Sequence, residues 1–151
     1  MNDNGYSGTP LIRKLGIKSG QVIAILNAPE GFDDTLGPLP DTVIVHRSLG
    51  SGPNGVSDAN DANDAPPFDI VLFFTTERAA LAALIAEVRP RMAPACGLWV
   101  AWPKRAAGLP TELTDHVVRE IALPTGLVDN KICAIDATWS GLRLVIRREL
   151  R

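Results

Sequence analysis

The stretch Gln21-Val-Ile-Ala-Ile-Leu-Asn-Ala-Pro-Glu-Gly31 decides the fold. Its five consecutive apolar residues, Val22–Leu26, leave no polar face, which predicts a strand of a parallel sheet covered by helices on both sides. The following turn, Asn27-Ala-Pro-Glu-Gly31, contains a proline and a glycine and ends the strand abruptly. Because ligands of open α/β sheets bind beyond the carboxyl ends of the strands, this turn is the first place to look for a functional site.

Length and composition limit the class of protein. The chain has 151 residues, enough for a single domain over residues 1–151, and its apolar fraction of 46% is ordinary for a globular protein. A formal net charge of −2 argues against dedicated binding of nucleic acid or of an anionic membrane. There is no apolar run of ~20 residues and no signal-peptide pattern at the start. Cys96 and Cys133 form no CxxC pair and are expected to be reduced thiols, so we expect a cytoplasmic protein.

The first half of the chain predicts short elements around the central strand. Thr9 and Pro10 fit the start of a short helix that ends at Gly16. Residues Glu30–Leu36 can form about two helical turns before a Gly-Pro-Leu-Pro segment stops them. Thr42–Val45 is expected to be a second strand.

The second half alternates strands and helices. Phe68–Phe74 predicts another buried strand, and a helix capped by Thr75 or Thr76 follows it and ends near Pro90. Gly97–Trp102 predicts a fourth strand. The next expected helix has a single apolar stripe, formed after a cap at Thr111 by Leu113, Val117 and Ile121.

The last two expected strands are Lys131–Ile135 and Leu142–Arg147. Only about five residues separate them, which is too few to connect parallel strands, so the chain is expected to end in an antiparallel hairpin.

Residues Ser48–Pro67 are expected to form a loop, in which residues 51–65 are a flexible low-complexity insert repeating Asp-Ala-Asn. The repeat does not match a calcium-binding EF-hand loop, because Ala62 falls where a ligand is required. His46 and His116 have no second ligand at metal-binding spacing. We therefore expect no metal.

The order of the elements predicts an α/β, three-layer Rossmann-like fold with a mostly parallel sheet and a C-terminal antiparallel hairpin. This ending resembles the S-adenosylmethionine-dependent methyltransferase fold, shortened by one early strand-helix unit. The resemblance implies the strand order 2-1-3-4-6-5. It covers most of the chain but concerns architecture, which does not by itself fix a function.

The methyltransferase cofactor pattern is poorly matched. A glycine-rich turn should follow the first strand, so that backbone amides can approach the ligand, but here the turn has one glycine and includes Pro29. The second strand should end in an acidic residue that holds ribose hydroxyls, but here it ends in His46 and Arg47. From the sequence, S-adenosylmethionine is therefore not the expected cofactor, and the cofactor stays unknown.

Long motifs across the chain also resemble a family of small bacterial proteins catalogued only as a domain of unknown function. The resemblance implies a bacterial cytosolic protein and supplies neither an activity nor catalytic residues. The motifs are Tyr6-Ser-Gly-Thr-Pro-Leu-Ile-Arg-Lys-Leu-Gly-Ile17, Asn27-Ala-Pro-Glu-Gly31, Trp102-Pro-Lys104, Gly126-Leu-Val-Asp129 and Cys133-Ala-Ile-Asp-Ala-Thr-Trp-Ser-Gly-Leu-Arg143.

The carboxyl ends of the parallel strands and the hairpin turn should share one rim of the sheet. Lys104 is a cation at the end of a core strand, where it could hold a carboxylate or phosphate, or instead pair with Asp136 or Glu30. Trp139 is either a ligand platform or a plug over the hairpin. The full set of candidate ligand-binding residues is Asn27, Glu30, Thr75, Lys104, Asp136, Trp139 and Ser140.

Three function classes follow. The first is a non-catalytic Rossmann-like module that binds an unknown protein partner or a small anionic ligand through this rim. The alternative is a divergent group-transfer enzyme, similar to S-adenosylmethionine-dependent methyltransferases, that uses Lys104 and Asp136. The third is a purely structural or assembly role.

Overall fold

The structure is a computed structural model that describes residues 10–49 and 67–151. The expected insert at 51–65 and the Thr9 cap lie outside these residues. The helices and strands in chain order are α1 (Leu11–Leu15), β1 (Val22–Leu26), α2 (Phe32–Leu36), β2 (Ile44–His46), β3 (Phe68–Phe74), α4 (Arg78–Val88), β4 (Met92–Pro103), α5 (Asp115–Ala122), β5 (Leu127–Ala134) and β6 (Trp139–Ile146).

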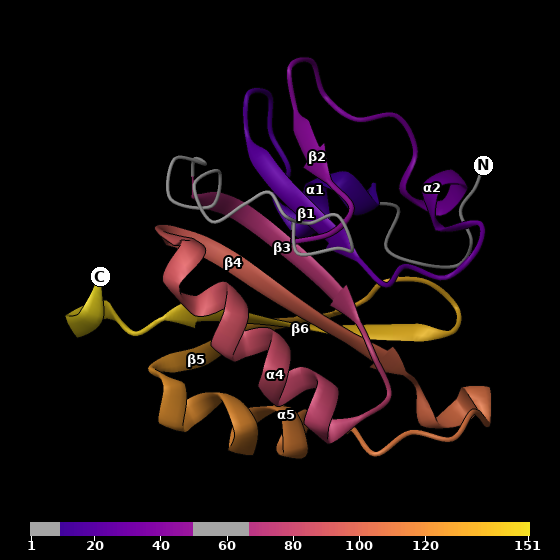
Figure 1. The fold of residues 1–151 in the computed structure, drawn as a ribbon. Coiled ribbons are helices and arrows are strands. Elements are labelled where there is room, and N and C mark those ends of the chain that lie inside the picture. Colours follow the sequence, from indigo (N-terminus) through magenta and orange to yellow (C-terminus); the bar gives the residue numbers. More distant parts are fainter. Residues whose placement is uncertain (1–9, 50–66) are drawn as a thin grey trace.

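The six strands form one sheet in the order β2-β1-β3-β4-β6-β5. β1 pairs in parallel with β2 and β3, and β3 with β4, whereas β6 is antiparallel to both β4 and β5. The predicted α/β Rossmann-like fold, its strand order and its C-terminal hairpin are therefore confirmed. The carboxyl ends of the parallel strands and the β5–β6 turn reach the same edge of the sheet (Figure 1).

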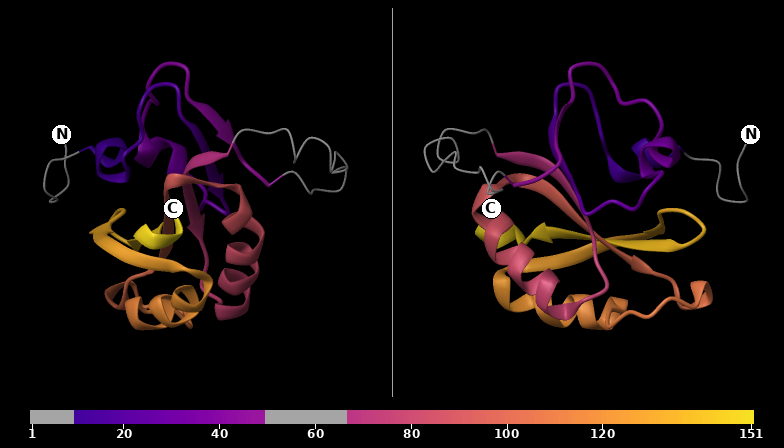
Figure 2. Two further views of the ribbon diagram at one scale, coloured as in Figure 1. Left: turned by 90° about the vertical axis from the view of Figure 1, so that its left-hand side faces the viewer. Right: turned by 45° about the vertical axis from the view of Figure 1, so that its right-hand side comes forward.

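Helices cover the two faces of the sheet unequally. The longer helices α4 and α5 lie side by side against one face, and the short helices α1 and α2 lie on the opposite side (Figures 1 and 2). Leu81 and Val118 bring α4 and α5 into the larger core, whereas Leu15 and Phe32 bring α1 and α2 into the smaller one. We call these the α4/α5 face and the α1/α2 face.

β1 lies in the interior of the sheet, as its sequence predicts. All five of its residues are buried, because side chains that alternate between the two faces meet a core on each side. Asp69 of β3 reinforces the pairing, since its carboxylate Oδ2 accepts a hydrogen bond of 2.9 Å from the backbone N–H of Val22.

Several boundaries differ from the predictions. β2 begins two residues later than expected, and β4 begins five residues earlier, at Met92. β5 begins at Leu127 instead of Lys131, and β6 begins at Trp139 instead of Leu142. Pairing between the two strands of the hairpin makes both longer than their apolar runs, because the polar residues at their ends also join the ladder.

The starts of both long helices were also predicted wrongly. Neither Thr75 nor Thr76 caps α4, whose first N–H, that of Arg78, instead donates to the side chain of Glu112 at 2.8 Å. Thr114, not Thr111, caps α5, because its side-chain oxygen accepts from the backbone N–H of Val117. The buried stripe of α5 is correspondingly centred on residues one position later than expected, Val118 and Ala122.

Two tryptophans of β4 belong to the core. Trp99 is fully buried and donates from Nε1 to the carbonyl of Leu15 at 3.1 Å, which ties β4 to α1, and Trp102 is buried against the α4/α5 face. Cys96 and Cys133 are both free thiols. Within residues 10–49 and 67–151, no helix is long and apolar enough to cross a membrane, and no His, Cys, Asp and Glu side chains gather in a group that could hold a metal ion.

Candidate functional site

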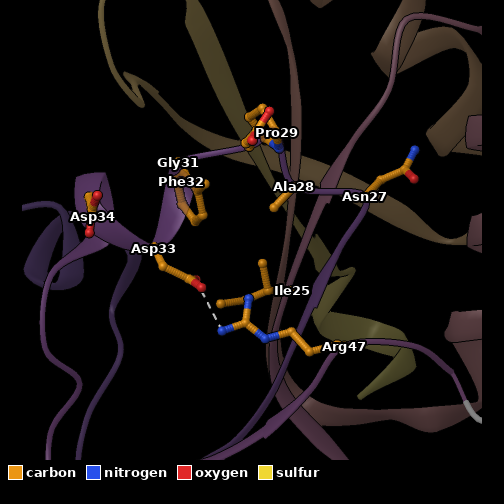
Figure 3. Close-up of a pocket in the computed structure, with 10 residues that line it drawn as sticks. Ile25, Asn27, Ala28, Pro29, Gly31, Phe32, Asp33, Asp34 and Arg47 are labelled. Atoms are coloured by element: carbon orange, nitrogen blue, oxygen red, sulfur yellow. Dashed lines mark hydrogen bonds and ion pairs between the residues drawn. The ribbon is translucent and has the colours of Figure 1, made fainter.

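A hollow of about 420 Å³ lies at the carboxyl ends of β1 and β2, the position where doubly wound sheets bind ligands (Figure 3). It is formed by the end of β1, the turn into α2, the first turn of α2 and the residue after β2. We call it the acidic hollow. Its lining residues are Ile25, Asn27, Ala28, Pro29, Glu30, Gly31, Phe32, Asp33, Asp34 and Arg47.

The charges of this lining are predominantly negative. Three carboxylates, from Glu30, Asp33 and Asp34, face one guanidinium, from Arg47, which leaves a formal charge of −2. Arg47 donates from a terminal guanidinium nitrogen to Asp33 Oδ1 at 3.1 Å (Figure 3). These side chains are 52% and 71% exposed, so their ion pair contributes little to stability and can open at little cost. A ligand can therefore compete with Arg47 for the Asp33 carboxylate.

The turn that shapes the hollow is held by Asn27. Asn27 has a φ of 63°, a left-handed conformation that asparagine tolerates better than most residues. Its side-chain Nδ2 donates to the carbonyl of Phe74 at 3.0 Å, which ties the end of β1 to the end of β3. The side chain points away from the other labelled side chains of the hollow (Figure 3). The structure thus places Asn27 as a support of the turn.

Aromatic rings connect the acidic hollow with the β5–β6 hairpin. Phe32 of the hollow packs edge-on against Phe74, with ring centroids 4.9 Å apart. Phe74 packs in the same manner against Trp139, at 5.1 Å. Trp139 is half-buried and packs against the core of the α1/α2 face. These contacts favour a plug over the hairpin rather than a ligand platform.

The hairpin turn is closed by Asp136. Its Oδ1 accepts hydrogen bonds of 2.8 Å from the backbone N–H groups of both Thr138 and Trp139. The half-buried Lys104 lies beside this turn, because its backbone N–H donates to the carbonyl of Thr138 at 2.8 Å. Ser140 lies inside the sheet, opposite Trp102. The structure therefore brings four of the candidate residues together at this turn, namely Lys104, Asp136, Trp139 and Ser140.

Thr75 is buried at the end of β3, with 7% of its surface exposed. Its backbone N–H donates to Ala101 at 3.1 Å and its hydroxyl accepts from the N–H of Glu77 at 3.2 Å. These bonds fix the path from β3 toward α4. Of the seven candidates, only Asn27 and Glu30 belong to the lining of the acidic hollow.

Sequence reasoning missed Phe32, Asp33, Asp34 and Arg47 as members of the site. A signal was available, since Arg47 follows the second strand and the two aspartates follow the turn after the first strand. Neighbouring parallel strands end side by side, so residues after β1 and after β2 were bound to meet. The carboxylate that is missing from the end of β2 is supplied by α2, a helix that the pattern of the second strand does not reveal.

A larger hollow of about 620 Å³ lies beside α5, on the α4/α5 face. Its lining is richer in apolar side chains and includes Trp102, Leu109, Leu113 and Ile132. It lies away from the β1 and β2 ends that the fold favours for ligands, so the acidic hollow is the better candidate site.

Comparison with known proteins reveals similarity in structure but not in sequence. No family model and no curated protein matches the chain. A methyltransferase from Aquifex aeolicus, described as S-adenosylmethionine-dependent, superimposes with a TM-score of 0.59 at 15% identity, over 90% of this chain and 87% of that one. Fibrillarin from Aeropyrum pernix, solved with natively bound S-adenosylmethionine, gives 0.54 at 13% identity, over 93% and 70%. The ribosomal protein L11 methylase of Lactobacillus delbrueckii gives 0.55 at 9% identity, over 91% and 75%.

The fold is that of the S-adenosylmethionine-dependent methyltransferases. This similarity agrees with the strand order and the terminal hairpin, and at such low identity it shows the fold alone. Membership of the bacterial family of unknown function stays a prediction, as does a cytoplasmic location.

Proposed function

We propose that this protein is a divergent group-transfer domain that binds a cationic nucleoside of the S-adenosylmethionine class in the acidic hollow. The observation that carries the proposal is the hollow itself, whose position at the ends of β1 and β2 is combined with a lining charge of −2. S-adenosylmethionine carries a sulfonium and an ammonium group against one carboxylate. Opposite charge attracts such a ligand and disfavours nucleotides, whose phosphates are negative.

Two features of the chain departed from the methyltransferase pattern, and the structure supports a substitute for one of them. The acidic residue missing from the end of β2 has a counterpart in Asp33 of α2, which lies within 3.1 Å of Arg47, the residue after β2. Asp33 can accept hydrogen bonds from ligand hydroxyls once Arg47 moves aside. The other departure, the single glycine and the proline in the β1 turn, remains.

A ligand of this class supplies an activated methyl group when it is bound. The chain's own residues would hold it: Ala28 and Pro29 offer partly exposed apolar surface to the adenine ring, and Asp33 and Asp34 offer acceptors. Asn27 keeps the turn in place through Phe74.

A second candidate function is binding without catalysis. The polar atoms and rings of three candidate residues already make contacts within the protein: Asp136, Thr75 and Trp139. This favours a module that binds the ligand without converting it. Measuring binding and turnover separately distinguishes the two candidates.

The first experiment is isothermal titration calorimetry of the whole protein with three nucleosides. We expect S-adenosylmethionine to bind more tightly than S-adenosylhomocysteine, which lacks the sulfonium charge, and ADP to bind most weakly. Asp33→Asn should weaken S-adenosylmethionine binding by about tenfold, or ~1.4 kcal/mol. Arg47→Gln should tighten it, because the hollow becomes more acidic and Asp33 loses its competitor.

Glu87→Gln, which removes an exposed carboxylate on α4, is the matched control and should change nothing. Binding of ADP that equals or exceeds that of S-adenosylmethionine overturns the proposal. If S-adenosylmethionine binds, release of S-adenosylhomocysteine in the presence of cell extract, lost in Asp33→Asn, favours group transfer. A bound ligand that stays intact favours the non-catalytic module.

A further inference from the structure

A second hollow, of about 230 Å³, lies on the α1/α2 face of the sheet, between α1 and the strands β5 and β6. Among the residues that the structure describes, those that line it include no aspartate or glutamate. Its lining consists of Arg13, Lys14, Leu15, Gly16, Asn130, Lys131 and Arg143. We call it the basic hollow. Four cationic side chains therefore converge from three separate segments of a chain whose formal net charge is −2.

A β-bulge creates the most unusual part of this cluster. Asp129 pairs with Leu144, but the next pair along the ladder joins Lys131 to Arg143, so Asn130 is the extra residue. Without the bulge, Asn130 would stand opposite Arg143 and Lys131 would point to the other face. The bulge thus places one cation directly opposite another, an arrangement that destabilises a sheet.

Arg143 is held in place by its surroundings. A side chain at Gly97 would collide with its guanidinium, since a Cβ there would lie 2.5 Å from Nε, so the glycine makes room for the arginine. A terminal guanidinium nitrogen donates to the side chain of Asn130, with the two atoms 3.4 Å apart. Burial is the main reason why the pKa of Arg143 is lowered, and the positive charge of Arg151 acts in the same direction. The protein therefore keeps a half-buried cation beside other cations.

Three of these four cations form no ion pair with a carboxylate in the part of the chain that the structure describes. They are Arg13, Lys131 and Arg143. Lys131 instead directs its ammonium toward the carbonyl of Lys14, at 3.5 Å. Converging cations that share a concave surface form a favourable site for an anion, which accepts hydrogen bonds from several of them at once.

We infer that the basic hollow binds a phosphate group, either free phosphate or a small phosphate monoester. Guanidinium groups bind the oxygens of phosphate in a bidentate manner, and ammonium groups add point charges. A volume of about 230 Å³ falls below the usual range for drug-sized ligands, which favours a small anion over a whole nucleotide. The basic hollow and the acidic hollow share no lining residue, so the inferred phosphate site does not depend on the proposed nucleoside site.

The test is a titration of the whole protein with inorganic phosphate, followed by calorimetry and by amide chemical shifts, at an ionic strength kept constant with KCl. We expect saturable binding and shifts confined to residues 13–16, 130–131 and 143. A parallel titration with glycerol 3-phosphate distinguishes a free phosphate site from a monoester site, according to which anion binds more tightly.

Lys131→Gln should weaken phosphate binding by about tenfold, because the phosphate loses one charged contact. Lys131 is exposed, so the substitution should not damage the core. Arg143→Gln should abolish binding, and if that variant fails to fold, Arg13→Gln together with Lys131→Gln replaces it. Lys18→Gln, an exposed lysine outside the lining, is the matched control and should bind as the wild type does. Asp33→Asn should leave phosphate binding unchanged, so this test and that of the proposed function succeed or fail independently.

Absence of saturable binding at constant ionic strength overturns the inference. So does binding that persists in the Arg13→Gln, Lys131→Gln double variant. In phosphate-free buffer of low ionic strength, Lys131→Gln should also raise the unfolding temperature, because it relieves the repulsion with Arg143. A lower unfolding temperature would contradict the inference, because it would mean that the protein already compensates the repulsion between Lys131 and Arg143.

Discussion

On one face of the sheet lie α4 and α5, of eleven and eight residues, whereas the opposite face carries α1 and α2, of five residues each. The long helices bury a continuous core, to which β1, β3, β4, β5 and β6 all contribute. The short helices leave surface uncovered at their ends, and both charged hollows lie there, next to Leu15 and Phe32. The comparison leads us to expect that the α4/α5 face provides most of the stability, whereas the proposed binding sites lie on the α1/α2 face.

The largest expected difference between the faces concerns the two cysteines. Cys96 is fully buried in the core of the α4/α5 face, and burial raises the pKa of its thiol to about 12. Cys133 lies half-buried on the other face, where burial also raises the pKa of the thiol but Lys14 and Lys131 oppose the rise. At pH 8 the thiolate is the reactive form, and Cys96 is reached only when the protein opens.

We therefore expect native alkylation at pH 8 to modify Cys133 more than ~10³-fold faster than Cys96, given the usual stability of a domain. Mass spectrometry of the intact protein and its peptides measures both rates. The variant Cys133→Ser isolates the slow reaction. Comparable rates for the two cysteines would contradict the assignment of stability to the α4/α5 face.

The next effect concerns the two cores. Leu81 of α4 is fully buried, and Leu81→Ala should lower the free energy of unfolding by about 3–5 kcal/mol, because the packed helices cannot collapse into the cavity. Leu36→Ala, at the end of α2, should cost less, about 2–3 kcal/mol, since the short helix can relax. Chemical denaturation measures both.

The two leucine variants should also differ in ligand binding. Leu36→Ala disturbs α2, which carries Asp33, and should weaken nucleoside binding, whereas Leu81→Ala should leave it unchanged at temperatures where the variant is folded. A larger loss of stability in Leu36→Ala, or a loss of binding only in Leu81→Ala, would reverse the roles of the two faces.

The smallest expected effect concerns the anchor of α1. Trp99→Phe removes the hydrogen bond to the carbonyl of Leu15 and should cost about 1–2 kcal/mol. Because α1 carries Arg13 and Lys14, the same change should weaken phosphate binding in the basic hollow. Trp102→Phe, an equal change on the α4/α5 face, should leave phosphate binding intact. Equal phosphate affinities in the two variants would show that α1 needs no anchor at Trp99.

Where the sequence predicted an element with the correct bounds, the pattern was local. β1 is an uninterrupted apolar run that ends at a turn, and β3 is an apolar run with Asp69 as its one polar residue, so Val22–Leu26 and Phe68–Phe74 were predicted as they occur. The start of β5 was predicted four residues too late, because an edge strand with polar residues has no such run. The start of α4 depends on Glu112, which is 34 residues away from Arg78, and no local pattern contains that information.

The sequence by itself determined the class of fold and the edge of the sheet at which a site should lie, because these follow from runs of apolar residues and from short connections. The strand order was implied by the resemblance to the methyltransferase fold. Only the tertiary structure decided the chemistry of that edge. The fold places Asp33, which follows β1, beside Arg47, which follows β2. A bulge at Asn130 sets Lys131 opposite Arg143. Charges meet through the register and path of the whole backbone, so their pairing cannot be obtained from any one segment.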